Sequence, residues 1–129
     1  MSSIFSKIVR GEIPCHKVAE DDKYLAFLDI TPLRKGHVLV IPKIETDYVF
    51  DMDDEDLAGL FVFSKKVAAK IKVAFPCKKV GVTIIGLEVP HAHVHLIPMN
   101  AMSDMNFMQP KLTLTHDELA QIAEQIRKA

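Results

Sequence analysis

The chain has few cysteines, no long apolar run and almost no net charge. Cys15 and Cys77 lack the CxxC spacing of a metal or redox motif, so we expect two free thiols in a cytosolic setting. No run approaches the roughly 18 apolar residues that cross a bilayer, and the N-terminus has no long apolar signal segment. A net charge of -1 gives no bulk basic field that would hold nucleic acid. These absences predict a soluble cytoplasmic protein without a membrane or nucleic-acid partner.

The composition is that of a single globular domain. The 129 residues are 49% hydrophobic and 26% charged, which are ordinary values for a folded domain. No internal repeat, low-complexity tract or linker divides the chain. We therefore expect one domain over residues 1–129.

The first half of the chain predicts a short helix followed by strands. Ser3 is a suitable helix cap, and Gly11 stands where the short helix would stop. The aspartates at 21 and 22 are a turn signal between two apolar runs, which indicates a hairpin. The predicted strands of this half cover residues 16–20, 24–30 and 37–41.

The second half predicts the main helix, two strands and a final helix. From Asp53 onward the apolar residues follow 3.6-residue spacing, and acidic residues open the run as at a helix N-terminus. Residues 80–85 form a fourth strand, which a tight link at 86–88 joins to the next. Thr115 and Glu118 have the spacing of a capping box. The pattern predicts a single α+β domain with about five strands.

Four methionines recur at every third position after the last predicted strand, at residues 99, 102, 105 and 108. Methionine fills irregular gaps over a core, and it also forms adaptable walls for ligands or partner chains. The pattern alone leaves both interpretations of the segment open.

Three histidines alternate with apolar residues over 90–98. Strict alternation predicts a strand, in which His91, His93 and His95 share one face while the apolar residues face the core. Same-face neighbours lie about 6.7 Å apart, so the outer two lie roughly 13 Å apart. The three imidazoles are therefore not placed to converge on one ion.

Two kinds of chemistry fit such a face, besides histidines with no chemical role. A neighbouring pair could hold a metal with help from His37 or Glu88, since zinc sites combine histidines with carboxylates. Alternatively, the middle histidine, His93, is a nucleophile that attacks phosphorus, because neutral imidazole is nucleophilic. Protonated neighbours would then be cationic donors to the phosphoryl oxygens.

The run His91-Ala92-His93-Val94-His95-Leu96-Ile97 resembles the signature of the histidine-triad superfamily of nucleotide hydrolases and transferases. Upstream residues are similar to blocks of that family in its order, and the chain resembles its purine nucleoside phosphoramidase branch. The resemblance covers roughly residues 4–100 and leaves the methionine-rich segment and last helix, 101–129, outside. The similar upstream blocks are residues 4–14, 26–32 and 36–43.

The resemblance implies a two-layer α+β fold whose five-stranded antiparallel sheet pairs with a second copy into a ten-stranded homodimer. It implies that His93 attacks the α-phosphorus of a small-molecule purine nucleotide substrate. A nucleotidyl-histidine forms, which water hydrolyses without a cofactor. His95 would contact the phosphate, while His91 and His37 would orient the site.

The resemblance also implies a nucleotide-binding surface. Asp29 matches the acid that binds the ribose hydroxyls, a role that suits a carboxylate acceptor. The apolar slot for the base is formed in the family by residues that match Ile4, Phe5, Ile8, Phe27 and Ile30.

The sequence departs from the family in two places. The link before the triad is short, with Leu87 in place of a glutamine and Glu88 in place of the serine that serves the leaving group. The departure makes a nucleotide-binding module with little catalysis an alternative to the enzyme. Ser3, Ser6 and Glu45 occupy positions where some members bind zinc, so we expect no structural zinc.

Overall fold

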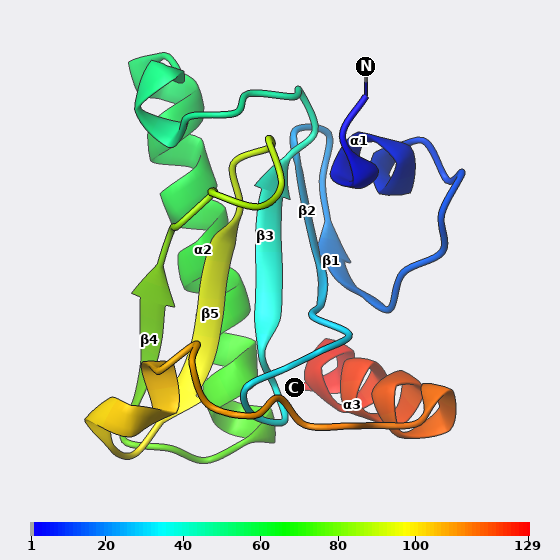
Figure 1. Cartoon of the computed structure of the whole chain (residues 1–129), viewed down its shortest axis with the longest axis vertical. Helices are drawn as coiled ribbons and strands as arrows, with labels where there is room; N and C mark the ends of the chain where they lie inside the picture. The colour runs from blue at the N-terminus through cyan, green and yellow to red at the C-terminus, as the bar shows by residue number, and fades with distance from the viewer. Residues whose placement is uncertain (1) are drawn as a thin grey trace.

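A five-stranded antiparallel sheet is the frame of the structure, a computed structural model that describes residues 2–129 (Figure 1). The strand order is β1-β2-β3-β5-β4, so β1 and β4 lie at the edges. The β4–β5 pair beside the triad is antiparallel, as the sequence predicts. The strands are β1 Lys17–Glu20, β2 Tyr24–Leu28, β3 Val38–Pro42, β4 Lys79–Thr83 and β5 Val94–Met99.

The two longer helices pack on one face of the sheet, and the short first helix packs on part of the other. The long helix α2 runs along one face, and α1 and α3 lie near opposite ends of the β1 side (Figure 1). Phe5 of α1 packs with Phe27 and Leu39 on the face opposite α2. The helices are α1 Ile4–Val9, α2 Asp54–Ala74 and α3 His116–Lys128, with short 3-10 turns η1 Val49–Asp51 and η2 Met102–Met105.

The caps of α1 and α3 are those that the sequence predicts, and α2 has one as well. The Ser3 hydroxyl accepts a hydrogen bond from the backbone N–H of Ser6 at the start of α1. Asp53 caps α2 in the same way. Thr115 and Glu118 form the capping box of α3. These local hydrogen bonds satisfy N–H groups that have no partner within a helix.

The central strands are buried on both sides. Every residue of β2 and of β3 is buried, because alternate side chains enter two different clusters. Val38 and Val40 pack toward α2 and α3, whereas Leu39 and Ile41 pack toward Phe5. The two-layer α+β class predicted from the sequence is confirmed.

The predicted strand over 90–98 is wrong in its first half, because β5 begins only at Val94. The backbone N–H of His91 donates to Val89 in a turn, and that of Ala92 donates to Thr46 in a loop. His37 likewise precedes β3, where its N–H donates to the Arg34 carbonyl. His91, His93 and His37 are therefore held by strand ends and turns rather than by a regular ladder.

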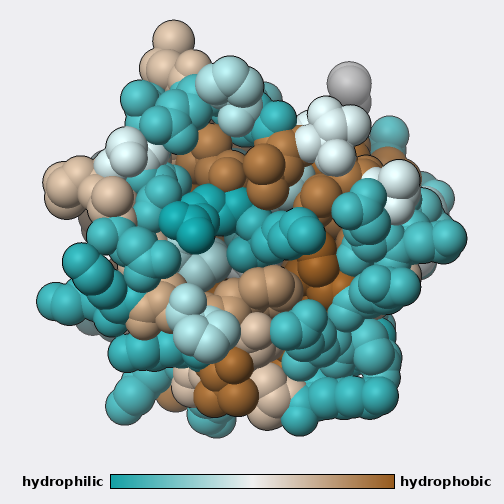
Figure 2. Space-filling view, turned by 90° about the horizontal axis from the view of Figure 1, so that it is seen from below, coloured by the Kyte–Doolittle hydropathy of each residue, from teal (hydrophilic) through white to brown (hydrophobic). Residues whose placement is uncertain are grey.

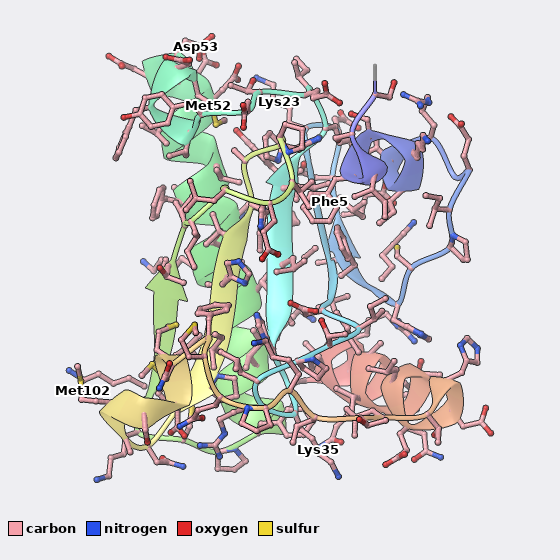
Figure 3. All side chains as sticks on the ribbon, in the orientation of Figure 1. Phe5, Lys23, Lys35, Met52, Asp53 and Met102 are labelled. Atoms are coloured by element: carbon pink, nitrogen blue, oxygen red, sulfur yellow. The ribbon has the colours of Figure 1, made fainter. Side chains whose placement is uncertain are left out.

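The four methionines fall into two pairs with different surroundings. Met99 and Met105 pack over Gly81 of β4, where a Cβ would clash with both. Met102 and Met108 are 90% and 91% exposed, and Met102 points away from the molecule (Figure 3). Gap-filling therefore explains only the first two.

The surface is mixed in character. The end of the molecule seen in Figure 2 is largely hydrophilic, with apolar side chains grouped between the polar ones. Within residues 2–129, none of the helices combines the length and the apolar character needed to span a bilayer. Cys15 and Cys77 are free thiols, as expected.

Replacing Gly59 of α2 by alanine should destabilise the fold. An added Cβ would lie 2.9 Å from Cζ of buried Tyr24 and closer still to its hydroxyl, which donates to the Asp56 carbonyl at 2.8 Å. Overpacking costs about 1–3 kcal/mol, and the higher helix propensity of alanine offsets about 1 kcal/mol. Urea unfolding would measure the net loss. Gln121→Ala on the exposed side of α3 is the control, and equal stabilities would contradict the prediction.

Candidate active site

Four histidines gather at the face of the sheet that α1 covers. His91 and His93 come from the turn before β5, His95 from β5 itself and His37 from the turn before β3. All four are buried, with exposed fractions between 0% and 7%. Neutral imidazole has one N–H donor and one acceptor nitrogen, so buried hydrogen bonds decide its tautomer.

His37 and His95 form the first hydrogen-bonded chain. The backbone N–H of Leu33 donates to His37 Nδ1 at 3.0 Å, so the hydrogen of neutral His37 is on Nε2. His37 Nε2 lies 3.0 Å from His95 Nδ1 and donates to it. The remaining hydrogen of His95 is therefore on Nε2. Through His37, the backbone N–H of Leu33 thus fixes the His95 tautomer in which Nε2 is the donor.

His91 and His93 form the second chain. His91 Nε2 lies 2.7 Å from the Pro42 carbonyl, which can only accept, so its hydrogen is on Nε2. His93 Nδ1 donates to the His91 carbonyl at 2.7 Å. The lone pair of neutral His93 is consequently on Nε2. This is the nitrogen that a nucleophilic role requires.

Two aromatic rings pack against the histidines. The Phe5 ring packs edge to face against the His93 ring, with ring centroids 4.9 Å apart, and Figure 3 shows it extending from α1 over the sheet. Phe107, which follows η2, lies 4.9 Å from His95 and 6.2 Å from His37. Phe107 was not predicted from the sequence. Its only signal was an aromatic residue inside an otherwise polar segment.

Burial makes His95 and His37 weak bases. Desolvation, with contributions from the neighbouring His37 and His93, lowers the pKa of His95 to about 3. Desolvation, with a contribution from the Lys111 charge, lowers the pKa of His37 to about 4. The expectation of cationic donors is therefore wrong for His95 and His37. His95 offers a neutral N–H instead.

Asp29, the predicted ribose ligand, lies just beyond β2. One carboxylate oxygen accepts from the Thr31 N–H at 2.9 Å, and the other lies 3.6 Å from His37 Nε2. Ligand atoms of Asp29, His37 and His95 lie within 4.8 Å of one another. The two facing imidazole nitrogens already share a hydrogen bond. A cation in this cluster would have to replace that bond.

The five predicted base-slot residues differ in burial. Phe5 and Phe27 are buried in one cluster, and Ile8 packs against it. Ile4 and Ile30 are 49% and 66% exposed. The structure thus brings Phe5, Ile8 and Phe27 together between α1 and the sheet and leaves the other two side chains at the surface.

Leu87 and Glu88 lie in the link between β4 and the triad. Leu87 is 89% exposed, and Glu88 is exposed as well. Within residues 2–129, neither is a hydrogen-bond or ring partner of the four histidines. The structure therefore does not bring the predicted leaving-group residues against the imidazoles.

Ser3, Ser6 and Glu45 lie together beside His91. The Ser3 hydroxyl is 2.8 Å from His91 Nδ1, and the Ser6 hydroxyl donates to Glu45 Oε1 at 2.7 Å. The hydrogen bond from the Ser3 backbone N–H and that from Ser6 lower the pKa of Glu45 to about 2. The sequence indicated only that these residues replace zinc ligands, and it did not predict that they contact the triad as polar groups.

We predict that the protein loses stability as the pH falls below 6.5. His95 and His37 bind protons in the unfolded chain near pH 6.5 but in the folded chain only near pH 3 to 4. The unfolded state therefore binds more protons in this window, and stability decreases by at most about 1.4 kcal/mol per pH unit for each histidine. Urea unfolding at about pH 7 and pH 5 would measure the slope. His95→Asn should make it shallower, and an unchanged slope would refute the assignment.

Known proteins have a similar sequence and fold. The HIT domain family model matches residues 10–102. An adenosine 5′-monophosphoramidase of Schizosaccharomyces pombe is 38% identical over 128 residues, which cover 98% of this chain and 96% of the relative. The protein hit of Bacillus subtilis is 39% identical over 108 residues, covering 78% and 73%.

Solved structures agree. A Hit-like protein of Bartonella henselae, described as involved in cell-cycle regulation, superposes with a TM-score of 0.85 at 32% identity, covering 98% of this chain and 95% of that one. A Zn-bound histidine triad family protein of Mycobacterium smegmatis gives 0.83 at 27% identity, covering 99% and 92%. The family model spans most of the chain, and these likenesses confirm the resemblance seen in the sequence. The chain belongs to the histidine-triad (HIT) family of nucleotide hydrolases and transferases.

Proposed function

We propose that the protein cleaves a phosphoramidate or a similar α-phosphate derivative of a purine nucleotide through His93. The observation that carries the proposal is the hydrogen bond from His93 Nδ1 to the His91 carbonyl, which leaves the Nε2 lone pair for attack. The similarity to an adenosine 5′-monophosphoramidase over nearly the whole chain supports this substrate class.

The reaction has two displacements at phosphorus. The His93 Nε2 lone pair forms a bond to the α-phosphorus, and the bond to the leaving group breaks with its electron pair on the leaving atom, which takes a proton from water. Water then attacks the nucleotidyl-histidine, releases its proton to solvent and returns the electron pair to Nε2. The His95 Nε2–H donates to a phosphoryl oxygen, whose charge increases in both steps.

Asp29 and the apolar residues near α1 are suited to hold the nucleoside. The Asp29 carboxylate accepts one hydrogen bond from the Thr31 N–H and retains acceptor capacity for ribose hydroxyls. Phe5 and Phe27 provide aromatic surface for the base, with Ile8 beside them. Ile4 and Ile30, which are exposed without a ligand, would be covered by it.

Replacing His93 by alanine should lower turnover by at least about 10³-fold, because the nucleophile is removed. Rapid-quench experiments with adenosine 5′-phosphoramidate should trap a nucleotidyl-protein in the unmodified chain and none in the variant. AMP binding, measured by calorimetry, should persist because the base and ribose contacts remain. His116→Ala on the exposed first turn of α3 is the control. Undiminished hydrolysis by the His93 variant would exclude the mechanism.

A nucleotide-binding module with little catalysis is the second candidate. The favouring observation is that Leu87 and Glu88 face solvent rather than the imidazoles, so neither supplies a leaving-group contact beside the triad. Rapid-quench trapping with phosphoramidates, aminoacyl-adenylates and dinucleoside polyphosphates separates the two candidates. AMP binding without a phosphohistidine from any of them would favour the module.

We also propose that two copies pair through β4 and α2. β4 is an edge strand with unpaired backbone groups, and Val82 on it is 50% exposed. Val62 and Val73 of α2 are 54% and 69% exposed. An exposed edge strand beside exposed apolar side chains is a suitable surface for a second copy.

Sedimentation at micromolar concentration should give a dimer. Val82→Lys combined with Val62→Lys should give a monomer, because two charges would be buried in the interface. Met108→Lys, at a side chain that is 91% exposed outside this surface, is the control and should stay dimeric. A monomeric unmodified chain would refute the pairing.

A further inference from the structure

Ser3, Ser6 and Glu45 form a hydrogen-bonded group, here called the serine–glutamate network, that joins α1 and the loop after β3 to His91. Ser3 is 5% exposed, Ser6 is 8% exposed and His91 is fully buried. A buried polar group without a partner costs about 1–3 kcal/mol, so each hydrogen in this network must have an acceptor. The distances allow those hydrogens to be assigned.

Glu45 determines the direction of the hydrogen bonds. Its Oε1 accepts from the Ser3 backbone N–H at 2.6 Å and from the Ser6 hydroxyl at 2.7 Å. The single hydroxyl hydrogen of Ser6 is therefore used, and its oxygen lies 3.4 Å from His91 Nδ1. The Ser3 hydroxyl, 2.8 Å from the same nitrogen, is the remaining donor. The carboxylate thus leaves Ser3 as the donor to His91.

The other side of His91 agrees with this assignment. Its Nε2 donates to the Pro42 carbonyl, so Nδ1 must accept, and the Ser3 hydroxyl satisfies it. The imidazole is held between two fixed groups in one tautomer. The carbonyl of the same residue then accepts from His93 Nδ1 at 2.7 Å. The network therefore reaches the reactive nitrogen of His93 through one residue.

We propose that Ser3, Ser6 and Glu45 are positioning residues for the nucleophile. They pair His91 Nδ1 and hold the His91 ring in one orientation, and the His91 carbonyl in turn holds His93 with its Nε2 lone pair toward the phosphate. The inference rests on the proposed function in taking His93 as the nucleophile. It goes beyond that function by adding three residues outside the triad and by giving the N-terminal helix a role in catalysis.

The alternative is a purely structural role, because the Ser3 hydroxyl also caps α1 by accepting from the Ser6 N–H at 3.0 Å. A cap stabilises the helix but does not require the hydrogen bond from the Ser3 hydroxyl to His91 Nδ1. That hydrogen bond and the rate of the covalent step are thus the measurements that separate the two roles.

The first test replaces Ser3. Ser3→Ala should lower the single-turnover rate of nucleotidyl-histidine formation by about 10- to 100-fold with little change in AMP affinity, because His93 is misaligned. In ¹⁵N NMR spectra of labelled histidine, the His91 Nδ1 resonance should move toward that of an imidazole nitrogen without a hydrogen-bond donor, while the Nε2–H held by the Pro42 carbonyl remains. Ser3→Thr keeps both the hydroxyl and the cap, and it should restore the rate and the spectrum. Ser64→Ala, which removes a buried hydroxyl bonded to the Leu60 carbonyl within α2, is the matched control.

The second test replaces Glu45, whose side chain lies at the surface. Glu45→Ala frees the Ser6 hydroxyl to compete for His91 Nδ1 and should reduce the rate in the same direction as Ser3→Ala. Glu45→Gln retains an acceptor oxygen and should preserve most of it. If the rate decreased as much in Glu45→Gln as in Glu45→Ala, the assigned hydrogen-bond direction would be contradicted.

The results distinguish failure of this inference from failure of the proposed function. If the unmodified chain forms no nucleotidyl-histidine, the proposed function fails, while the ¹⁵N spectra still test whether the network fixes His91. If Ser3→Ala keeps the rate and the His91 Nδ1 resonance, the positioning role is overturned even though the enzyme is active. A thermal unfolding curve for each variant identifies any that is only partly folded. If Ser3→Ala is partly folded, the rate of Glu45→Ala, which leaves the helix cap intact, decides between the two roles.

Discussion

Burial of four imidazole rings is the constraint on which the site depends. A buried ring nitrogen needs a partner, and a neutral ring has one donor and one acceptor, so the surroundings fix which nitrogen carries the hydrogen. The partners here are mostly backbone groups: the N–H of Leu33 and the carbonyls of Pro42 and His91. Because backbone positions are held by the fold itself, the tautomers are part of the folded structure.

Two chains of hydrogen bonds approach the triad from opposite ends of the sheet. One begins at the 33–37 turn and ends at the donor nitrogen of His95. The other begins at Glu45 and Ser3 and passes through His91 to His93. A donor and a nucleophile are the two functions that displacement at phosphorus requires side by side. The His93 and His95 rings, with centroids 5.0 Å apart, meet where the chains end.

Aromatic rings complete the site by excluding water. Phe5 comes from the first helix and Phe107 from the segment after η2, so both ends of the chain contribute. Burial, to which Phe107 contributes, keeps His95 and His37 neutral, as the lowered pKa values show. A neutral donor at His95 can strengthen its hydrogen bond as charge develops on a phosphoryl oxygen. Low polarity around the site is therefore suited to the proposed reaction.

The sequence predicted most of the elements because their signals are local. Ser3, Asp53 and Thr115 are helix caps whose partners lie three residues away, and periodicity identified α2 and α3. The limits of β5 were misplaced because alternation continues through His91 and His93, where the backbone bonds to a turn and a loop instead of a strand. Alternation reports which face a side chain takes, but it does not report what the backbone pairs with.

By itself the sequence determined the α+β class, the triad and the family, because these depend on residue types at fixed spacings along the chain. Only the tertiary structure decided that His37 joins His95, that Phe107 covers both, and that Ser3 and Glu45 reach His91. These contacts join residues 42 to 88 positions apart in most cases, and such pairings leave no periodic trace in a single sequence. The charge state of His37 and His95 also depends on the tertiary structure, since an imidazole that could be cationic in water is neutral when burial desolvates it.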